Sequence, residues 1–133
     1  MTTDLYYLTL TALLCVLLWL PYIAGSVGLL GMLTPDDYQK AGYPKKDHAP
    51  GWLERANRTH VNLVENLPSF ASLVLVAHIT GEADSATALA AMIFFWSRVA
   101  HAIVYLTGLP YLRTLTFAVS VTCQVVIGYQ ILT

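Results

Sequence analysis

The sequence predicts an all-α integral membrane protein, a bundle of four transmembrane helices. Of its 133 residues, 56% are hydrophobic and only 11% are charged, whereas about 25% of a typical soluble domain is charged. The mean hydropathy is +0.59. A soluble protein of this size could not cover its surface with so few charged side chains, so we expect lipid rather than water around the helices. Its length is enough for one domain, which we place over residues 1–133.

Four apolar runs supply the predicted helices. A helix of about 20 apolar residues crosses the hydrocarbon core of a bilayer, which is about 30 Å thick. Transmembrane strands would be about half as long and would alternate between polar and apolar residues. The helices are therefore predicted at about 5–32, 54–80, 86–107 and 110–132.

The first run, residues 5–32, has no basic segment before it and exceeds the apolar part of a signal peptide, so we expect a mature helix. Pro21 is expected to bend it. The turn "GEADS" at 81–85 and the turn "TGLP" at 107–110 separate the later helices. Pro110 is placed to begin the fourth helix, because proline favours the first helical position.

Seven basic residues determine the predicted topology. Five lie in the long loop 33–53 or at the start of the second helix, and Arg113 follows the turn 107–110. The N-terminus and the 81–85 turn have none. The positive-inside rule then places the loop and the 107–110 turn in the cytoplasm and both termini outside it. An even number of crossings agrees with this arrangement.

Net charge and cysteine usage exclude several classes of function. The formal net charge is −1, so there is no basic field for nucleic acid. Cys15 and Cys123 each lie in the middle of an apolar run, as small buried hydrophobes do. No metal-ligand spacing is present, and we expect no metal and no disulfide.

The stretch "ERANRTHVNLVENLPSF", residues 54–70, carries a polar stripe where a membrane helix should be apolar. Arg55, Arg58, Asn62 and Glu65 follow the spacing i, i+3, i+7, i+10, which places them on one helix face. A carboxylate in this position must face the bundle or a watery cavity and find a cation there. A purely structural polar stripe that locks helices together is the alternative.

The third and fourth helices add polar groups at the same end. In "SRVAHAIVY", Arg98, His101 and Tyr105 share a face, and Arg113 and Thr114 lie in the first turn of the fourth helix. That position favours anions. Taken alone, His101 is better interpreted as a packing residue, and Tyr105 fits an interfacial belt as well as a site. Three or four arginines, the stripe asparagine and glutamate, and a tyrosine together predict a cationic pocket open to the cytoplasm, in which arginines bind carboxylates.

The same residues resemble the family of membrane-associated proteins in eicosanoid and glutathione metabolism (MAPEG), in a form typical of bacterial members. "ERANRTHVNLVEN" is similar to its helix-two pattern E-R-x-x-R-x-x-x-N-x-x-E, and "RVAHAIVYLTGLPYLRTLTF" is similar to its segment joining the third and fourth helices. The likeness extends over nearly the whole chain.

The resemblance implies a homotrimer that binds glutathione as a cosubstrate at subunit interfaces, together with membrane lipid and a lipophilic small molecule. It implies a transferase or peroxidase in a membrane, with the bacterial inner membrane expected. Arg113 would be catalytic by stabilising the thiolate. The residues that would hold glutathione are Arg55, Arg58, Asn62, Glu65, Arg98, Tyr105 and Thr114.

Two departures from the family pattern support a competing function. Residues 5–32 contain no basic residue, although many members carry an arginine there, and Phe117 stands where a contacting tyrosine occurs. A non-catalytic protein of the same fold that binds a lipid or metabolite is therefore the alternative. A transporter is less well supported, since no inverted repeat or pair of broken helices is visible. Neither the second substrate nor the choice of glutathione over another thiol follows from the sequence.

Overall fold

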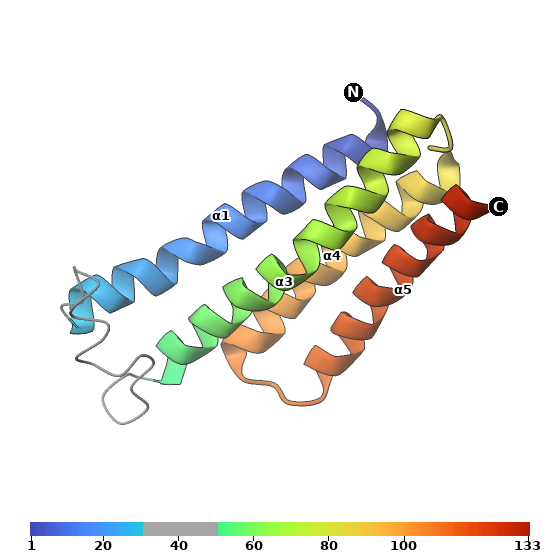
Figure 1. Ribbon diagram of the computed structural model, residues 1–133. Helices are drawn as coiled ribbons and strands as arrows, with labels where there is room; N and C mark the ends of the chain where they lie inside the picture. The colour runs from blue at the N-terminus through green and yellow to red at the C-terminus, as the bar shows by residue number, and fades with distance from the viewer. Residues whose placement is uncertain (31–50) are drawn as a thin grey trace.

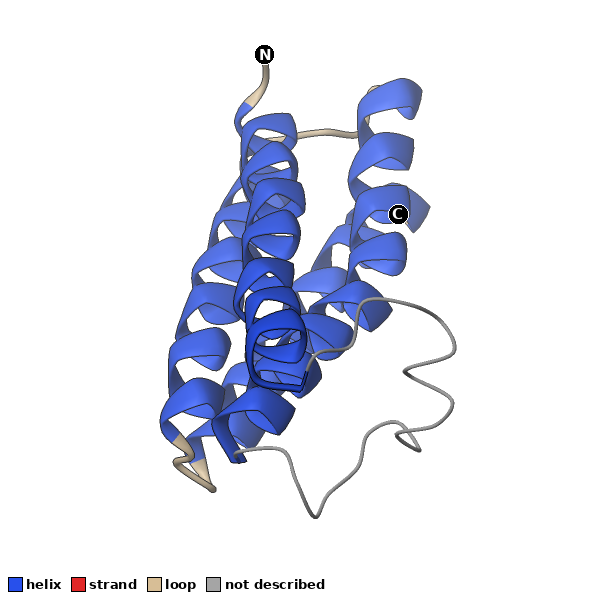
Figure 2. Cartoon of the chain, turned by 90° about the vertical axis from the view of Figure 1, so that its left-hand side faces the viewer, coloured by secondary structure: helices blue, strands red, loops and turns tan. Residues whose placement is uncertain are grey.

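The computed structural model describes residues 1–30 and 51–133, which form helices and short connections without strands (Figure 2). The helices are α1 (Thr3–Leu30), α3 (Gly51–Thr80), α4 (Ser85–Thr107) and α5 (Leu112–Leu132). All four are long and apolar enough to cross a membrane. The predicted all-α class with four membrane-spanning helices is confirmed.

The helix ends differ from the predicted ones in ways that the local chemistry explains. Helix α1 continues through Pro21, and its predicted end at residues 31–32 lies outside the described residues, as does most of the 33–53 loop. Helix α4 begins after Asp84, whose Oδ1 accepts hydrogen bonds from the backbone N–H groups of Ala86 and Thr87, both at 2.9 Å. This cap satisfies N–H groups that the first helical turn leaves without partners.

The prediction that Pro110 begins the fourth helix is wrong. Gly108 ends α4 in the left-handed conformation, with φ of 81°, and its N–H donates to the carbonyl of Tyr105 at 3.1 Å. Glycine reaches this conformation without steric penalty. Pro110 then lies in the turn, and α5 begins at Leu112.

Helices α3 and α4 form the centre of the packing. Each contacts all the other described helices, whereas α1 and α5 do not contact each other. The two termini and the turn between α3 and α4 lie at one end of the bundle, and the turn between α4 and α5 lies at the other (Figure 1). We call the latter the turn end. Both termini at one end agree with an even number of membrane crossings.

The apolar core occupies the half of the bundle nearer the termini. The rings of Phe70 and Phe94 stack with centroids 3.8 Å apart and planes 10° apart. Other buried core residues around them are Val74, Ala77, Ala90, Ala91, Cys123 and Ile127. Toward the turn end the hydroxyls of Ser97 and Ser120 form a buried 2.8 Å hydrogen bond, and a second, smaller apolar cluster of Tyr22, Leu53 and Ala56 packs there. The main apolar core thus lies toward the termini, whereas Arg98 and His101 are buried nearer the turn end.

Gly25 allows α1 to approach α3 closely at the turn end. A Cβ atom on Gly25 would lie 2.5 Å from Leu53 Cδ1 and 2.7 Å from Trp52 Cη2, whereas a Cβ on Gly28 would meet nothing within 4 Å. Overpacking of this kind costs about 1–3 kcal/mol. We expect Gly25→Val to unfold at a lower temperature in detergent than Gly28→Val. Equal melting temperatures for the two variants would contradict this close approach, because valine has the same helix propensity at both positions.

Candidate functional site

The residues of the polar stripe on α3 lie in different surroundings at the turn end. Arg55 and Arg58 line one pocket, and Asn62 lines a second. Glu65 is exposed and lines neither pocket. One chain therefore brings together three of the four predicted stripe residues.

The first pocket, which we call the turn pocket, has a volume of about 350 Å³. It is bounded by the start of α3, the end of α4 and the turn that leads into α5. Three arginines and a single carboxylate line it, so its formal charge is positive. The lining residues are Glu54, Arg55, Arg58, Tyr105, Gly108, Leu109, Pro110 and Arg113. Arginine-rich surroundings favour a ligand with carboxylate groups.

The second pocket, which we call the helix pocket, has a volume of about 260 Å³ and lies deeper along α3, α4 and α5. Its lining residues are Asn62, His101, Tyr105, Arg113, Thr114 and Phe117. Tyr105 and Arg113 line both pockets. The two pockets are therefore adjacent, and one extended ligand can reach from the turn into the bundle.

Arg113 lies at the junction of the two pockets and is held over an aromatic ring. Its Cζ atom is 5.7 Å from the centroid of the Tyr105 ring, within the range of a cation–π interaction. Arg113 is in the first turn of α5, where Tyr111 gives no side-chain cap. The first backbone N–H groups of such a helix favour negative charge. An anion placed here meets both a guanidinium and the positive end of a helix dipole.

Arg55 connects α3 to the last turn of α4. Its Nε donates to the backbone carbonyl of Leu106 at 3.1 Å, which places a cation beside the carbonyl end of the helix. Arg58, by contrast, is exposed. Arg55 and Arg58 thus differ in what they contribute to the fold, although both line the turn pocket.

Arg55→Ala is expected to reduce the free energy of unfolding by about 1–2 kcal/mol, because a hydrogen bond to a charged donor is lost. Arg58→Ala should leave it nearly unchanged. The check is thermal unfolding of both variants in detergent without ligand. A loss of the same size in both would show that the Arg55 contact does not stabilise α4.

Arg98 does not line either pocket, although the sequence grouped it with the residues that would hold the ligand. It is only 2% exposed and lies between α4 and α3. Its Nη2 donates a hydrogen bond to Oδ1 of Asn62. Its partner in the described residues is thus the stripe asparagine.

The structure adds residues that the sequence left out of the site. His101 is buried, lines the helix pocket, and its ring centroid lies 5.6 Å from that of Tyr105. Its Nδ1 has no hydrogen-bond partner among the described residues. The shared face with Arg98 and Tyr105 was the available signal. Glu54 was missed because it lies outside the stripe.

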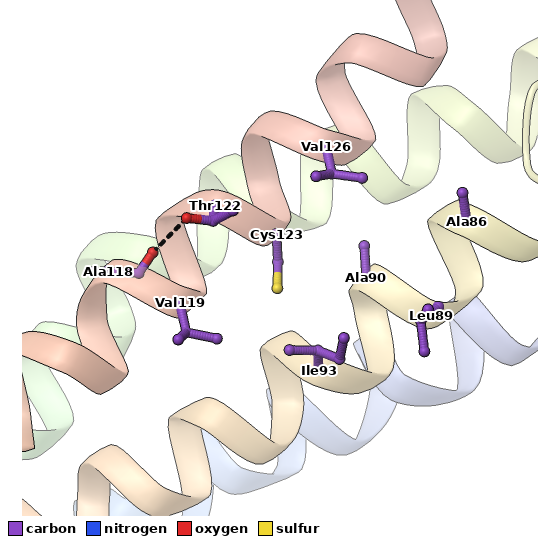
Figure 3. Close-up of a pocket in the computed structure, with 9 residues that line it drawn as sticks. All are labelled: Ala86, Leu89, Ala90, Ile93, Ala118, Val119, Thr122, Cys123 and Val126. Atoms are coloured by element: carbon purple, nitrogen blue, oxygen red, sulfur yellow. Dashed lines mark hydrogen bonds between the residues drawn. The ribbon is translucent and has the colours of Figure 1, made fainter.

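An apolar groove of about 420 Å³ runs between α4 and α5 (Figure 3), and none of its lining residues lines either polar pocket. Figure 3 shows Cys123 directed into it from α5, with alanines on the facing helix. Its lining residues are Ala86, Leu89, Ala90, Ile93, Ala118, Val119, Thr122, Cys123 and Val126. The hydroxyl of Thr122 is occupied by the carbonyl of Ala118 at 2.9 Å. The groove therefore offers a ligand only apolar contacts.

Comparison with known proteins agrees with this architecture. The MAPEG family profile matches residues 6–133. The chain is 31% identical to microsomal glutathione S-transferase 1 of Bos taurus over 106 residues, 74% of this chain and 67% of the relative. It is 32% identical to the Rattus norvegicus protein over the same shares of both chains, and 33% identical to the Homo sapiens protein over 60% of this chain and 52% of that one. With four membrane-spanning helices and a family match over almost its full length, the chain belongs to the MAPEG family.

Proposed function

We propose that this protein is a glutathione-dependent membrane transferase or peroxidase that acts on lipophilic electrophiles. The observation that carries the proposal is the position of Arg113, over the Tyr105 ring at the junction of the two pockets. The relatives at 31–33% identity are glutathione transferases by name. Glutathione carries two carboxylates and one ammonium group, which suits a pocket with three arginines and a glutamate.

Arg113 would act on the thiol of the bound peptide. A free thiol has a pKa of about 8.5, and a neighbouring guanidinium lowers the pKa by stabilising the thiolate. A decrease of two pH units corresponds to about 2.7 kcal/mol of differential stabilisation. An arginine at an uncapped helix N-terminus is suited to supply this, and Thr114 beside it offers a hydroxyl hydrogen bond to the sulfur.

The chemical step is nucleophilic attack by the thiolate on the lipophilic substrate. In transfer to a carbon electrophile, a sulfur–carbon bond forms and the leaving group departs with the bonding electron pair. In peroxide reduction, the thiolate sulfur takes the terminal oxygen of the hydroperoxide as the O–O bond breaks, and the alkoxide that leaves is protonated to an alcohol. The sulfenic acid formed then reacts with a second glutathione to give the disulfide and water.

A homotrimer with its sites between subunits would complete the arrangement. Glu65 is exposed on α3 in the single chain, and α1 does not cover α5 among the described helices. A neighbouring subunit on this side would shield Glu65 from lipid and bring it to a bound ammonium group. The proposed site opens toward the cytoplasm, with both termini on the other side of a bacterial inner membrane, as the distribution of basic residues predicts.

A non-catalytic lipid-binding protein is the second candidate. The apolar groove between α4 and α5 and the apolar Phe117 in the helix pocket favour it. The absence of a basic residue from Thr3–Leu30 also removes one cation from the helix that would complete the site. This candidate predicts that lipophilic ligands bind and that no electrophile is turned over.

The test is a glutathione titration of the detergent-purified protein, followed by thiolate absorbance in the ultraviolet. We expect a saturable thiolate signal and turnover of a chlorinated dinitrobenzene or a lipid hydroperoxide. Cysteine and other small thiols are titrated in parallel to establish which thiol is used. No signal and no turnover with any thiol, from protein that is folded and trimeric, would refute the proposal in favour of lipid binding.

A further inference from the structure

Arg98 is a buried cation whose position is unusual for a membrane helix. It lies near the middle of α4, is only 2% exposed, and is directed at α3. Its Nη2 donates to Oδ1 of Asn62, while its Nε and Nη1 have no acceptor among the described residues. The guanidinium therefore acts on a single polar group, the side-chain amide of Asn62.

The amide of Asn62 has only one orientation that suits this contact. A guanidinium donates hydrogen bonds and cannot accept them, so the atom that faces Arg98 must be Oδ1. Rotating the amide would place its NH₂ group against the guanidinium, donor against donor. The main chain is also held, because Asn66 Nδ2 donates to the Asn62 carbonyl at 2.8 Å. Arg98 thus fixes which end of the amide is free.

The free end is the Nδ2 group, on the side of the planar amide away from Arg98. Asn62 is half-buried and lines the helix pocket, whereas Arg98 does not line it. Asn62 shares the helix pocket with His101 and Arg113, and because its Oδ1 is turned to Arg98, Nδ2 is the end of the amide left for that pocket. A ligand atom that meets Nδ2 there must be a hydrogen-bond acceptor.

We propose that Arg98 is a positioning residue that orients the Asn62 amide so that Nδ2 donates to a carboxylate or carbonyl oxygen of bound glutathione. This inference rests on the proposed function. Arg98 itself does not touch the ligand. Its charge-assisted hydrogen bond, of a kind stronger than one between neutral groups, keeps the acceptor end of the amide away from the carboxylate.

Asn62→Asp is the most direct test, because it changes one atom and keeps Arg98 paired. The new carboxylate accepts from Arg98 on one side and presents an acceptor to the pocket on the other. We expect glutathione affinity to fall about tenfold to hundredfold, with no loss of thermal stability. Asn57→Asp is the matched control, since Asn57 is half-buried on the same helix and lines neither pocket. It reports the effect of the added negative charge alone.

A double-mutant cycle separates positioning from a general structural role. Arg98→Met should weaken glutathione binding in the wild-type background but not in the Asn62→Ala background, because Arg98 acts through Asn62. Arg98→Lys, which can still donate to Oδ1, should restore part of the affinity. If Arg98→Met does not fold, Arg98→Lys and Asn62→Asp decide the question.

The results also distinguish this inference from the proposed function. Wild-type affinity in Asn62→Asp, or an equal effect of Arg98→Met in both backgrounds, would overturn the positioning role while glutathione binding by the wild type stands. Absence of glutathione binding by the folded wild-type protein would overturn the function, and this inference with it. If Arg98→Met weakens glutathione binding only where Asn62 is retained, the result would support both the positioning role and the proposed function.

Discussion

Arg113→Ala is expected to abolish the glutathione thiolate signal and to lower turnover about a hundredfold. Without the guanidinium, the pKa of the bound thiol returns toward about 8.5, and only a few per cent of it is ionised at neutral pH. A hundredfold change corresponds to about 2.7 kcal/mol, within the range lost when one electrostatic partner is removed from a reaction centre. The measurement combines ultraviolet titration with steady-state kinetics.

Two further variants show whether charge or position matters at Arg113. Arg113→Lys keeps a cation but loses the planar group that stacks over Tyr105 at 5.7 Å. Tyr105→Phe keeps the ring face and should retain the thiolate signal. Because Arg113 is exposed on the first turn of α5, Arg113→Ala should melt at the wild-type temperature. Turnover that survives Arg113→Ala would show that another group activates the thiol.

Phe94→Ala is expected to have the largest effect on stability. The Phe94 side chain is fully buried and stacks on Phe70 at the centre of the apolar core. Replacing a buried phenylalanine by alanine in soluble proteins costs about 3–5 kcal/mol. In lipid, the lost packing rather than transfer from water makes up most of this cost. Thermal unfolding in detergent is the measurement, and we expect a large decrease in the melting temperature.

Trp96→Ala is the control for this prediction. Trp96 is on the same helix but is 57% exposed and directed away from the core. It should change the melting temperature little, although the side chain removed is larger. If the two variants melt together, the contribution of Phe94 does not come from its packing against Phe70.

The sequence predicted the fold because length and hydropathy decide it. Runs of about 20 apolar residues must be helical in lipid, where every backbone polar group needs an internal partner. Spacing along α3 also placed Arg55, Arg58 and Asn62 on one face at the turn end, where the pockets are. These are properties of a single helix, and periodicity describes a single helix well.

Contacts between helices could not be predicted in the same way. Spacing gave Arg98 the same face as His101 and Tyr105, but it does not say that Arg98 meets Asn62 while His101 reaches the pocket. Those distances depend on how α3 and α4 approach each other. Helix propensity alone placed Pro110 at the start of the fourth helix. In the structure the left-handed Gly108 is followed by a turn that contains Pro110, and α5 begins only at Leu112.

The tight connection between α3 and α4 has a consequence for membrane insertion during synthesis. Only four residues, 81–84, separate the helices, and Arg98 near the middle of α4 finds its acceptor on α3. An arginine at the centre of a helix inserted alone costs about 2.5–3.5 kcal/mol. We therefore expect α4 to enter the bilayer poorly by itself and efficiently as a hairpin with α3, which glycosylation-site mapping of α4 alone and of α3 and α4 together would measure. Arg98, which we propose orients Asn62, would then also make the order of helix synthesis matter, since Asn62 must already be in the membrane when Arg98 arrives.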